Sequence, residues 1–162
     1  MQTTHLLVFQ FALSLAAYAA IGGWFVWPWL QRTPRRAALS ILLLPQLFRH
    51  VGVNLMVPEV VDPELPVAFA RQAAIGDVLS VALAWLALVS LRAGWSFAIA
   101  TVWSFNLIGL ADLLFNLANA ARLGVAEHLG AAWYAPAFIV PAMFVVHVLI
   151  FAVLLRGDEH AA

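Results

Sequence analysis

The sequence contains no cysteine and no lysine, and only 10% of its 162 residues are charged. Without cysteine, a disulfide framework and thiolate metal or redox chemistry are both excluded. The eight arginines are balanced by eight acidic residues, so the chain has no basic excess, and nucleic-acid binding is not expected. The scarcity of charge also argues against a water-soluble domain, in which about 25% of residues are charged.

What the chain has in abundance is apolar sequence. Hydrophobic residues make up 65% of it, which is more apolar surface than a soluble domain of this size could bury. A helix needs about 20 mostly apolar residues to cross a bilayer. Five segments meet this requirement, namely residues 5–30, 37–57, 69–91, 95–120 and 132–155. We therefore predict one all-α transmembrane domain over residues 1–162, a five-helix bundle integral to a bacterial inner (cell) membrane, with the lipid bilayer as a partner.

The first segment has a second interpretation, a cleaved signal peptide. It lacks a basic start, it is long for a signal peptide, and it ends in Trp24, Trp27 and Trp29, a pattern typical of a membrane-interface belt. These features favour a retained helix.

The arginines predict the orientation, because short cytoplasmic loops collect positive charge. Five of them fall on one side of the bundle, namely Arg32, Arg35, Arg36, Arg92 and Arg156. The other side carries Arg71 and Arg122 beside acidic residues. This distribution places the N-terminus outside and the C-terminus inside.

Ionisable residues within the spans are the candidates for function, since such groups are costly in hydrocarbon. His50, Asp77 and Asp112 each lie about seven residues from the outer end of their helix, so each should lie ~10 Å below the outer surface. Their common depth predicts one shared pocket, and we take these three as the candidate catalytic residues. The candidate ligand-binding residues are Gln46, Asn54, Asn106, Asn116, Trp103 and Tyr134. No metal site and no cofactor are expected.

The predicted second helix, residues 37–57, carries three polar residues that we assign to one face from their spacing. Gln46, His50 and Asn54 follow one another at intervals of four residues, which places them on one face of an α-helix.

Structural roles remain open for several polar residues. Amides in membrane helices more often bond to a neighbouring helix than to a ligand. Asp77 could simply be protonated or paired with Arg49. His147 should lie deeper than the other three groups, where a structural hydrogen bond is the expected role. Pro141 predicts a bend in the last helix, because proline removes one backbone hydrogen bond.

Residues 45–156 show a resemblance to a known family. The run Trp133-Tyr134-Ala135-Pro136 followed by Pro141 looks like the last helix of EXPERA-domain proteins, which include the emopamil-binding sterol isomerases and the sigma-two receptor. The segment around Arg49-His50 resembles the family's His-x-x-x-carboxylate helix, and Asp77 falls where the family has a glutamate. Asn54 departs from the pattern, because the isomerases have a carboxylate there.

The resemblance implies a pocket for a sterol-like or other small hydrophobic or cationic amphiphilic ligand. Isomerisation needs one group that gives a proton and one that takes it, and His50 with Asp77 could serve, whereas Asn54 cannot. Binding without turnover therefore stays open beside isomerisation. The alternatives are a small transporter or proton-coupled channel subunit and a structural subunit of a membrane complex. A homodimer is also compatible with the sequence.

Overall fold

The structure is a computed structural model that describes residues 2–156, and every regular element in this range is helical. Five helical spans are long and apolar enough to cross a membrane: Thr3–Gln31, Arg35–Met56, Val67–Ala93, Ala98–Arg122 and Gly130–Leu155. The predicted all-α fold and its five spans are confirmed, and each boundary lies within three residues of the predicted one.

The first and last spans both change helix type near their prolines. The first consists of α1 (Thr3–Ile21), a π-helical turn (Gly22–Val26) and α2 (Trp27–Gln31), which contains Pro28. The last consists of a 3₁₀ turn (Gly130–Trp133), a π-helical turn η5 (Ala135–Ile139) and α6 (Val140–Leu155), which contains Pro141. Proline has no N–H to donate, so a wider turn before it is a natural adjustment. The sequence predicts a bend at Pro141, and the structure has a change from π-helix to α-helix directly before this proline.

The second span is α-helical only in its first half. It begins with α3 (Arg35–Leu43) and continues as a 3₁₀ helix, η2 (Pro45–Met56). A 3₁₀ helix has three residues per turn, so its faces repeat every third residue. The buried residues of η2 follow this period: Gln46, Arg49 and Gly52.

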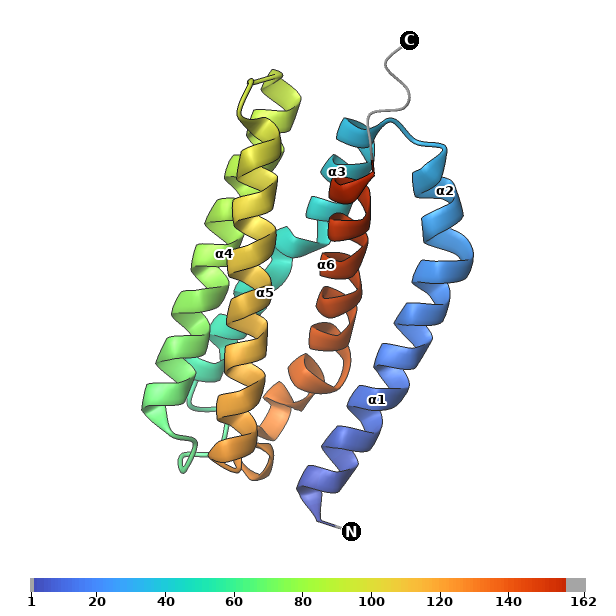
Figure 1. The fold of residues 1–162 in the computed structure, drawn as a ribbon. Coiled ribbons are helices and arrows are strands. Elements are labelled where there is room, and N and C mark those ends of the chain that lie inside the picture. Colours follow the sequence, from blue (N-terminus) through green and yellow to red (C-terminus); the bar gives the residue numbers. More distant parts are fainter. Residues whose placement is uncertain (1, 157–162) are drawn as a thin grey trace.

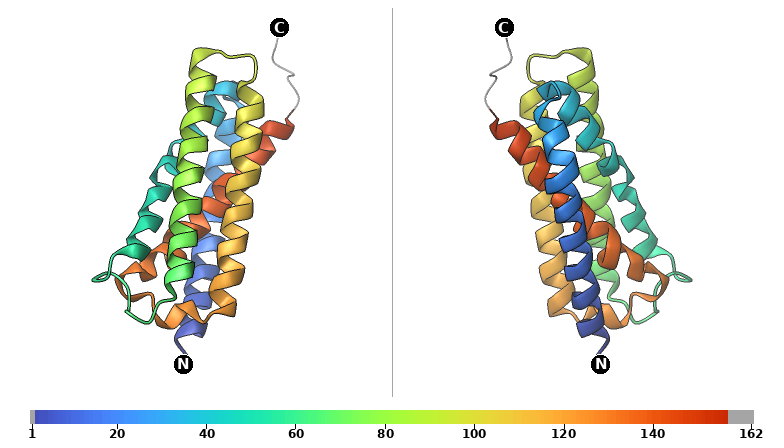
Figure 2. Two further views of the ribbon diagram at one scale, coloured as in Figure 1. Left: turned by 90° about the vertical axis from the view of Figure 1, so that its left-hand side faces the viewer. Right: turned by 90° about the vertical axis from the view of Figure 1, so that its right-hand side faces the viewer.

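The α4 helix (Val67–Ala93) and the α5 helix (Ala98–Arg122) form an antiparallel hairpin, and Figures 1 and 2 show them side by side along their length. Gly94 closes the turn between them with a φ of 72°, a conformation that favours glycine. The η2 segment packs against α4, whereas α1 packs along α6 and η5 and has no buried residue of its own. A peripheral helix with an apolar exposed surface suits a lipid environment.

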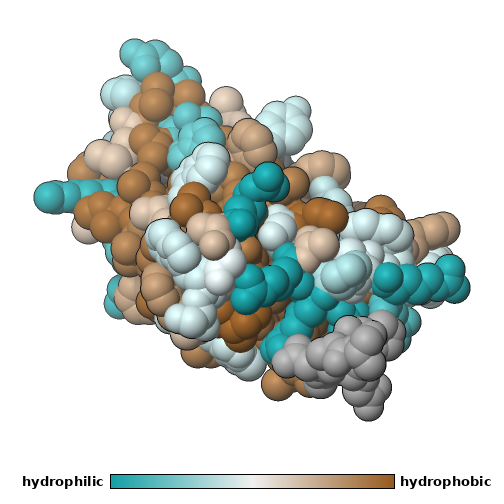
Figure 3. All heavy atoms as spheres, turned by 90° about the horizontal axis from the view of Figure 1, so that it is seen from above, coloured by the Kyte–Doolittle hydropathy of each residue, from teal (hydrophilic) through white to brown (hydrophobic). Residues whose placement is uncertain are grey.

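The two ends of the bundle differ in charge, and the first and last of residues 2–156 lie at opposite ends (Figure 1). We call one the arginine end; it contains Arg32, Arg35, Arg36, Arg92 and Arg156. We call the other the acidic end; it contains residues 57–66 and 123–129, with Glu59, Asp62, Glu64 and Glu127. Viewed from the arginine end, hydrophilic residues lie among hydrophobic ones on the end face (Figure 3).

At the arginine end, two arginines form hydrogen bonds to backbone carbonyls at the ends of neighbouring spans. The Arg156 guanidinium donates to the carbonyls of Leu30 (2.8 Å) and Thr33 (3.0 Å), and Arg35 donates to the carbonyl of Leu154 (2.6 Å). Basic side chains are favourable partners for the free carbonyls at helix C-termini.

Candidate functional site

Arg49 is the centre of the polar interior. Its side chain is only 2% exposed. Nε donates to Asp77 Oδ1 (2.9 Å), Nη2 lies 2.8 Å from the same oxygen and 2.7 Å from Asp112 Oδ2, and Nη1 donates to the carbonyl of Gly109 (3.0 Å). The three helices η2, α4 and α5 thus meet at one guanidinium. We call Arg49, Asp77 and Asp112 the triad.

The triad fits because glycines stand beside each of its members. A Cβ atom on Gly52 would collide with the Asp77 carboxylate, and a Cβ on Gly76 would collide with the Asp112 carboxylate. A Cβ on Gly109 would lie 3.1 Å from Arg49 Nη1. These glycines therefore provide the close backbone approach that two carboxylates and a guanidinium require.

His50 does not join Asp77 and Asp112, contrary to the predicted convergence of all three. Its side chain is exposed, and its Nδ1 lies 3.0 Å from the carbonyl of Leu47 in the same helix. The physical reason is the 3₁₀ period of η2, which turns Arg49 inward and His50 outward. The face predicted for Gln46, His50 and Asn54 is wrong for the same reason, because Gln46 is buried whereas the other two are exposed.

A chain of hydrogen bonds leads from the acidic end to the triad. Asn119 Nδ2 donates to Gln72 Oε1 (3.3 Å), Gln72 Nε2 donates to Asn116 Oδ1 (2.7 Å), and Asn116 Nδ2 donates to Asp112 Oδ1 (3.1 Å). At the helix end, Arg122 Nη2 donates to Asn119 Oδ1 (3.4 Å). Asn116, a predicted ligand-binding residue, therefore orients a carboxylate, which agrees with the structural role left open for such amides.

A second group of polar side chains lies about one helical turn from the triad toward the arginine end. Relative to the triad, Gln46 precedes Arg49 by three residues, and Ser80 follows Asp77 by three. Asn106 and His147 complete this group, which we call the inner polar layer. All four side chains are fully buried.

His147 forms the structural hydrogen bond that the sequence predicts for it. Its Nδ1 lies 2.6 Å from Asn106 Oδ1, while Asn106 Nδ2 donates to the His147 carbonyl (3.2 Å). Because the oxygen of the Asn106 amide accepts, Nδ1 carries the proton and Nε2 is an open acceptor. Nε2 lies 3.3 Å from the point where a Cβ on Gly109 would stand, beside Arg49. The phenyl ring of Phe105 stacks on the imidazole.

Three side chains of the inner polar layer have atoms without a hydrogen-bond partner among the described residues. They are Gln46, through both atoms of its amide, Ser80, through its hydroxyl, and His147, through Nε2. Buried polar atoms are almost always hydrogen-bonded. This layer therefore has an unused capacity for hydrogen bonds.

A groove of about 210 Å³ lies near the acidic end, between η2 and the start of the last span. Its lining includes Gly52, Asn54 and Leu55 on one side and Tyr134 and Ala135 on the other. Gly52 also contacts the Asp77 carboxylate, so the groove and the triad share a wall. The predicted ligand-binding residues Asn54 and Tyr134 meet here.

Trp103, another predicted ligand-binding residue, lies away from the groove. It packs against the apolar core and contacts the ring of Phe151 at 5.6 Å between centroids.

A core of packed apolar side chains closes the polar interior toward the arginine end. Its fully buried members come from all five spans: Leu30, Ala38, Leu39, Leu43, Ala84, Ala87, Ala98, Val102, Phe105, Ile150 and Val153. Beyond this apolar layer, Ser90 and Thr101 form a hydrogen bond of 2.7 Å. Apart from this pair, the buried polar groups of the described residues run from the acidic end to about half the depth of the bundle, and apolar packing separates them from the other end.

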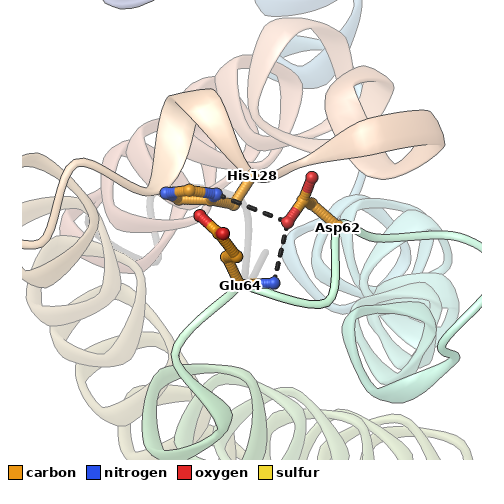
Figure 4. Close-up of side chains that lie close together, drawn as sticks. All are labelled: Asp62, Glu64 and His128. Carbon is orange, nitrogen blue, oxygen red and sulfur yellow. Dashed lines mark hydrogen bonds and ion pairs between the residues drawn. The ribbon is translucent and has the colours of Figure 1, made fainter.

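Figure 4 shows Asp62, Glu64 and His128 in the loops of the acidic end, with one potential ligand atom of each within 4.8 Å of the others. Asp62 Oδ1 accepts from the backbone N–H of Glu64 (2.7 Å) and lies 3.6 Å from His128 Nδ1. The backbone N–H of Asp62 also donates to the His128 carbonyl (3.0 Å). These contacts hold together the two loops that border the groove.

A family model described as "Domain of unknown function (DUF8737)" matches residues 6–155. No curated protein and no solved structure matches the chain.

Proposed function

The chain belongs to the DUF8737 family, a domain of unknown function, so its role must come from its own residues, and we propose that it is an integral membrane protein that binds a small cationic amphiphile. The observation that carries this proposal is the triad, in which two carboxylates share one guanidinium.

The charge of the triad favours a cation. When both carboxylates are ionised, Arg49 neutralises only one of them, and a net negative charge remains in a low-dielectric interior. Asp77 places both contacts to Arg49 on Oδ1, while Oδ2 faces Gly52, a residue of the groove wall. A ligand with one positive charge would bring this site to neutrality.

The groove suits the apolar part of such a ligand. Its walls are mostly aliphatic, with Asn54 and Tyr134 as polar groups, a composition that is usual for small-molecule sites. Its volume of about 210 Å³ is small for a complete sterol, so the groove favours an alkyl chain or a single ring system.

The apolar core favours binding over transport. A transporter or proton-coupled channel needs polar groups on both sides of the membrane centre, whereas here Phe105 and its buried neighbours close the path toward the arginine end. A structural subunit would turn its polar residues toward partner helices, whereas Arg49, Asp77 and Asp112 face the interior of this bundle, which favours a binding role.

The geometry favours binding without turnover over isomerisation of the EXPERA type. An isomerase reaction would need His50 and Asp77 to face one substrate, but His50 lies on the exposed side of η2.

In the membrane we place the arginine end at the cytoplasmic face and the acidic end, with the groove, at the outer face. The support for this orientation is the arginine count, because cytoplasmic loops are enriched in basic residues. Ligand would then reach the groove from the outer leaflet.

The experiment is a comparison of ligand-induced thermal shifts for wild type and Asp77→Asn in detergent, with a set of alkylamines and a set of neutral sterols and alcohols. We expect Asp77→Asn to fold, because Asp112 still pairs with Arg49, and to lose the shift with amines while keeping the shift with neutral ligands. Glu127→Gln, which neutralises an exposed carboxylate at the acidic end, is the matched control and should behave as wild type. Equal losses for both ligand classes would refute the proposal.

A further inference from the structure

We propose that the inner polar layer selects a primary ammonium group, so that the ligand is a primary alkylamine rather than a quaternary or tertiary one. This inference rests on the proposed function, because the triad attracts the positive charge and the layer then recognises its N–H groups.

Three fully buried acceptors carry the inference: the Ser80 hydroxyl, the Gln46 amide oxygen and His147 Nε2. None of them has a hydrogen-bond partner among residues 2–156. A primary ammonium has three N–H donors and no acceptor, so its hydrogen-bonding demand equals what these atoms offer.

The orientation of His147 is fixed for this role. Asn106 accepts from Nδ1 and donates to the His147 carbonyl, so the amide can neither turn nor accept from the other ring nitrogen. The lone pair of Nε2 therefore stays available on the side of Gly109 and Arg49. Both atoms of the Gln46 amide are unbonded, so that side chain can turn its oxygen toward a donor.

The inner polar layer lies where the ammonium group of a ligand would arrive after passing the triad. The side chains of Asp77 and Asp112 are 18% and 14% exposed, whereas the layer behind them is fully buried. An ammonium between the two would have the carboxylates of Asp77 and Asp112, with the guanidinium of Arg49 that they share, on one side and three neutral acceptors on the other. A trimethylammonium group has no N–H and would leave all three acceptors unpaired, which costs free energy in a buried site.

The test measures dissociation constants for dodecylamine, dodecyltrimethylammonium and dodecanol in lipid nanodiscs. We expect wild type to bind dodecylamine about tenfold more tightly than dodecyltrimethylammonium, the factor that one charge-assisted hydrogen bond contributes. Ser80→Ala and Gln46→Met should each reduce this preference by about threefold or more and leave the trimethylammonium affinity unchanged. Ser104→Ala is the matched control, because the Ser104 hydroxyl is exposed and bonded to Ala100 in its own helix, and it should keep the preference.

The outcomes separate this inference from the proposed function. Equal affinity of wild type for the two cations, or a preference that neither Ser80→Ala nor Gln46→Met reduces, overturns the inference. If Asp77→Asn still weakens both cations relative to dodecanol in that case, the proposed function stands. If neither cation binds more tightly than dodecanol, both fail.

Discussion

Replacement of Arg49 by methionine tests the triad as the centre of the fold. Methionine keeps the unbranched shape of the side chain but removes the only cation among residues 2–156 that pairs with Asp77 and Asp112. The lost contacts are those from Nε and Nη2 to the two carboxylates, at 2.7–2.9 Å, and the hydrogen bond from Nη1 to Gly109. Two partly buried carboxylates would then face each other without compensation.

Removal of one partner from a buried ion pair costs about 3–5 kcal/mol, because the remaining charge is left unpaired. With Arg49 at 2% exposure, we expect the free energy of unfolding to fall by about 3 kcal/mol or more and the midpoint of thermal unfolding in detergent to fall by roughly 10 °C. Arg71→Met removes an exposed arginine near the acidic end and should change stability by less than about 0.5 kcal/mol.

A rescue variant distinguishes unpaired charge from lost packing. The triple variant Arg49→Met, Asp77→Asn, Asp112→Asn has no buried charge in the triad, and it should recover most of the stability that Arg49→Met alone loses. Unfolding of Arg49→Met within about 1 kcal/mol of wild type, or a triple variant no more stable than the single one, would refute this reasoning.

Three further predictions follow from other parts of the molecule. Gly76→Ala should destabilise the protein strongly, because the new methyl group would collide with the Asp112 carboxylate. Gly23→Ala, which has no atom within 4 Å of its Cβ position, should leave the stability unchanged. Thermal unfolding compares the two variants, and equal midpoints would contradict the packing argument. Ser80→Ala should raise stability by about 1 kcal/mol in the absence of ligand, because it removes a buried hydroxyl that has no partner; a loss of stability would show that the hydroxyl is bonded. Single cysteines in this cysteine-free chain should react with an impermeant thiol reagent in intact cells at positions 58–66 and not at positions 32–36; the reverse pattern would invert the proposed orientation.

The five spans could be predicted from the sequence because they depend only on length and hydrophobicity. The sequence also allowed a pairing of Asp77 with Arg49, because a charge in an apolar span requires a partner. The role of Asp112 at that same guanidinium depends on Gly76, which lets α4 and α5 approach, and the sequence shows such a glycine only as a small residue.

The predicted inward face of the second helix was wrong, because hydropathy does not distinguish a 3₁₀ helix from an α-helix. Spacing of four residues groups Gln46 with His50, whereas the 3₁₀ period groups Gln46 with Arg49 and Gly52. Pro45 at the change of helix type was the one available signal, since proline removes an α-helical hydrogen bond.

His147 lies deeper than the triad and bonds to Asn106, as the sequence predicts, because its position in an apolar span leaves it no other kind of partner. Side chains on an α-helix point toward the helix N-terminus, which for α6 is the acidic end, so the imidazole lies closer to the triad than its Cα position suggests. The same rule directs Asp112 toward the arginine end, since α5 runs in the opposite direction, and thereby toward Arg49.

The central claim is that the triad holds a net negative charge that binds a cation. The most direct measurement is isothermal titration calorimetry of dodecylamine and dodecanol with wild type and Asp77→Asn in nanodiscs. Because an unscreened charge pair in a protein interior is worth several kcal/mol, we predict that the variant binds dodecylamine at least about tenfold more weakly, while its affinity for dodecanol stays the same. Equal affinity of the two proteins for dodecylamine, or a parallel loss for dodecanol, would contradict the account.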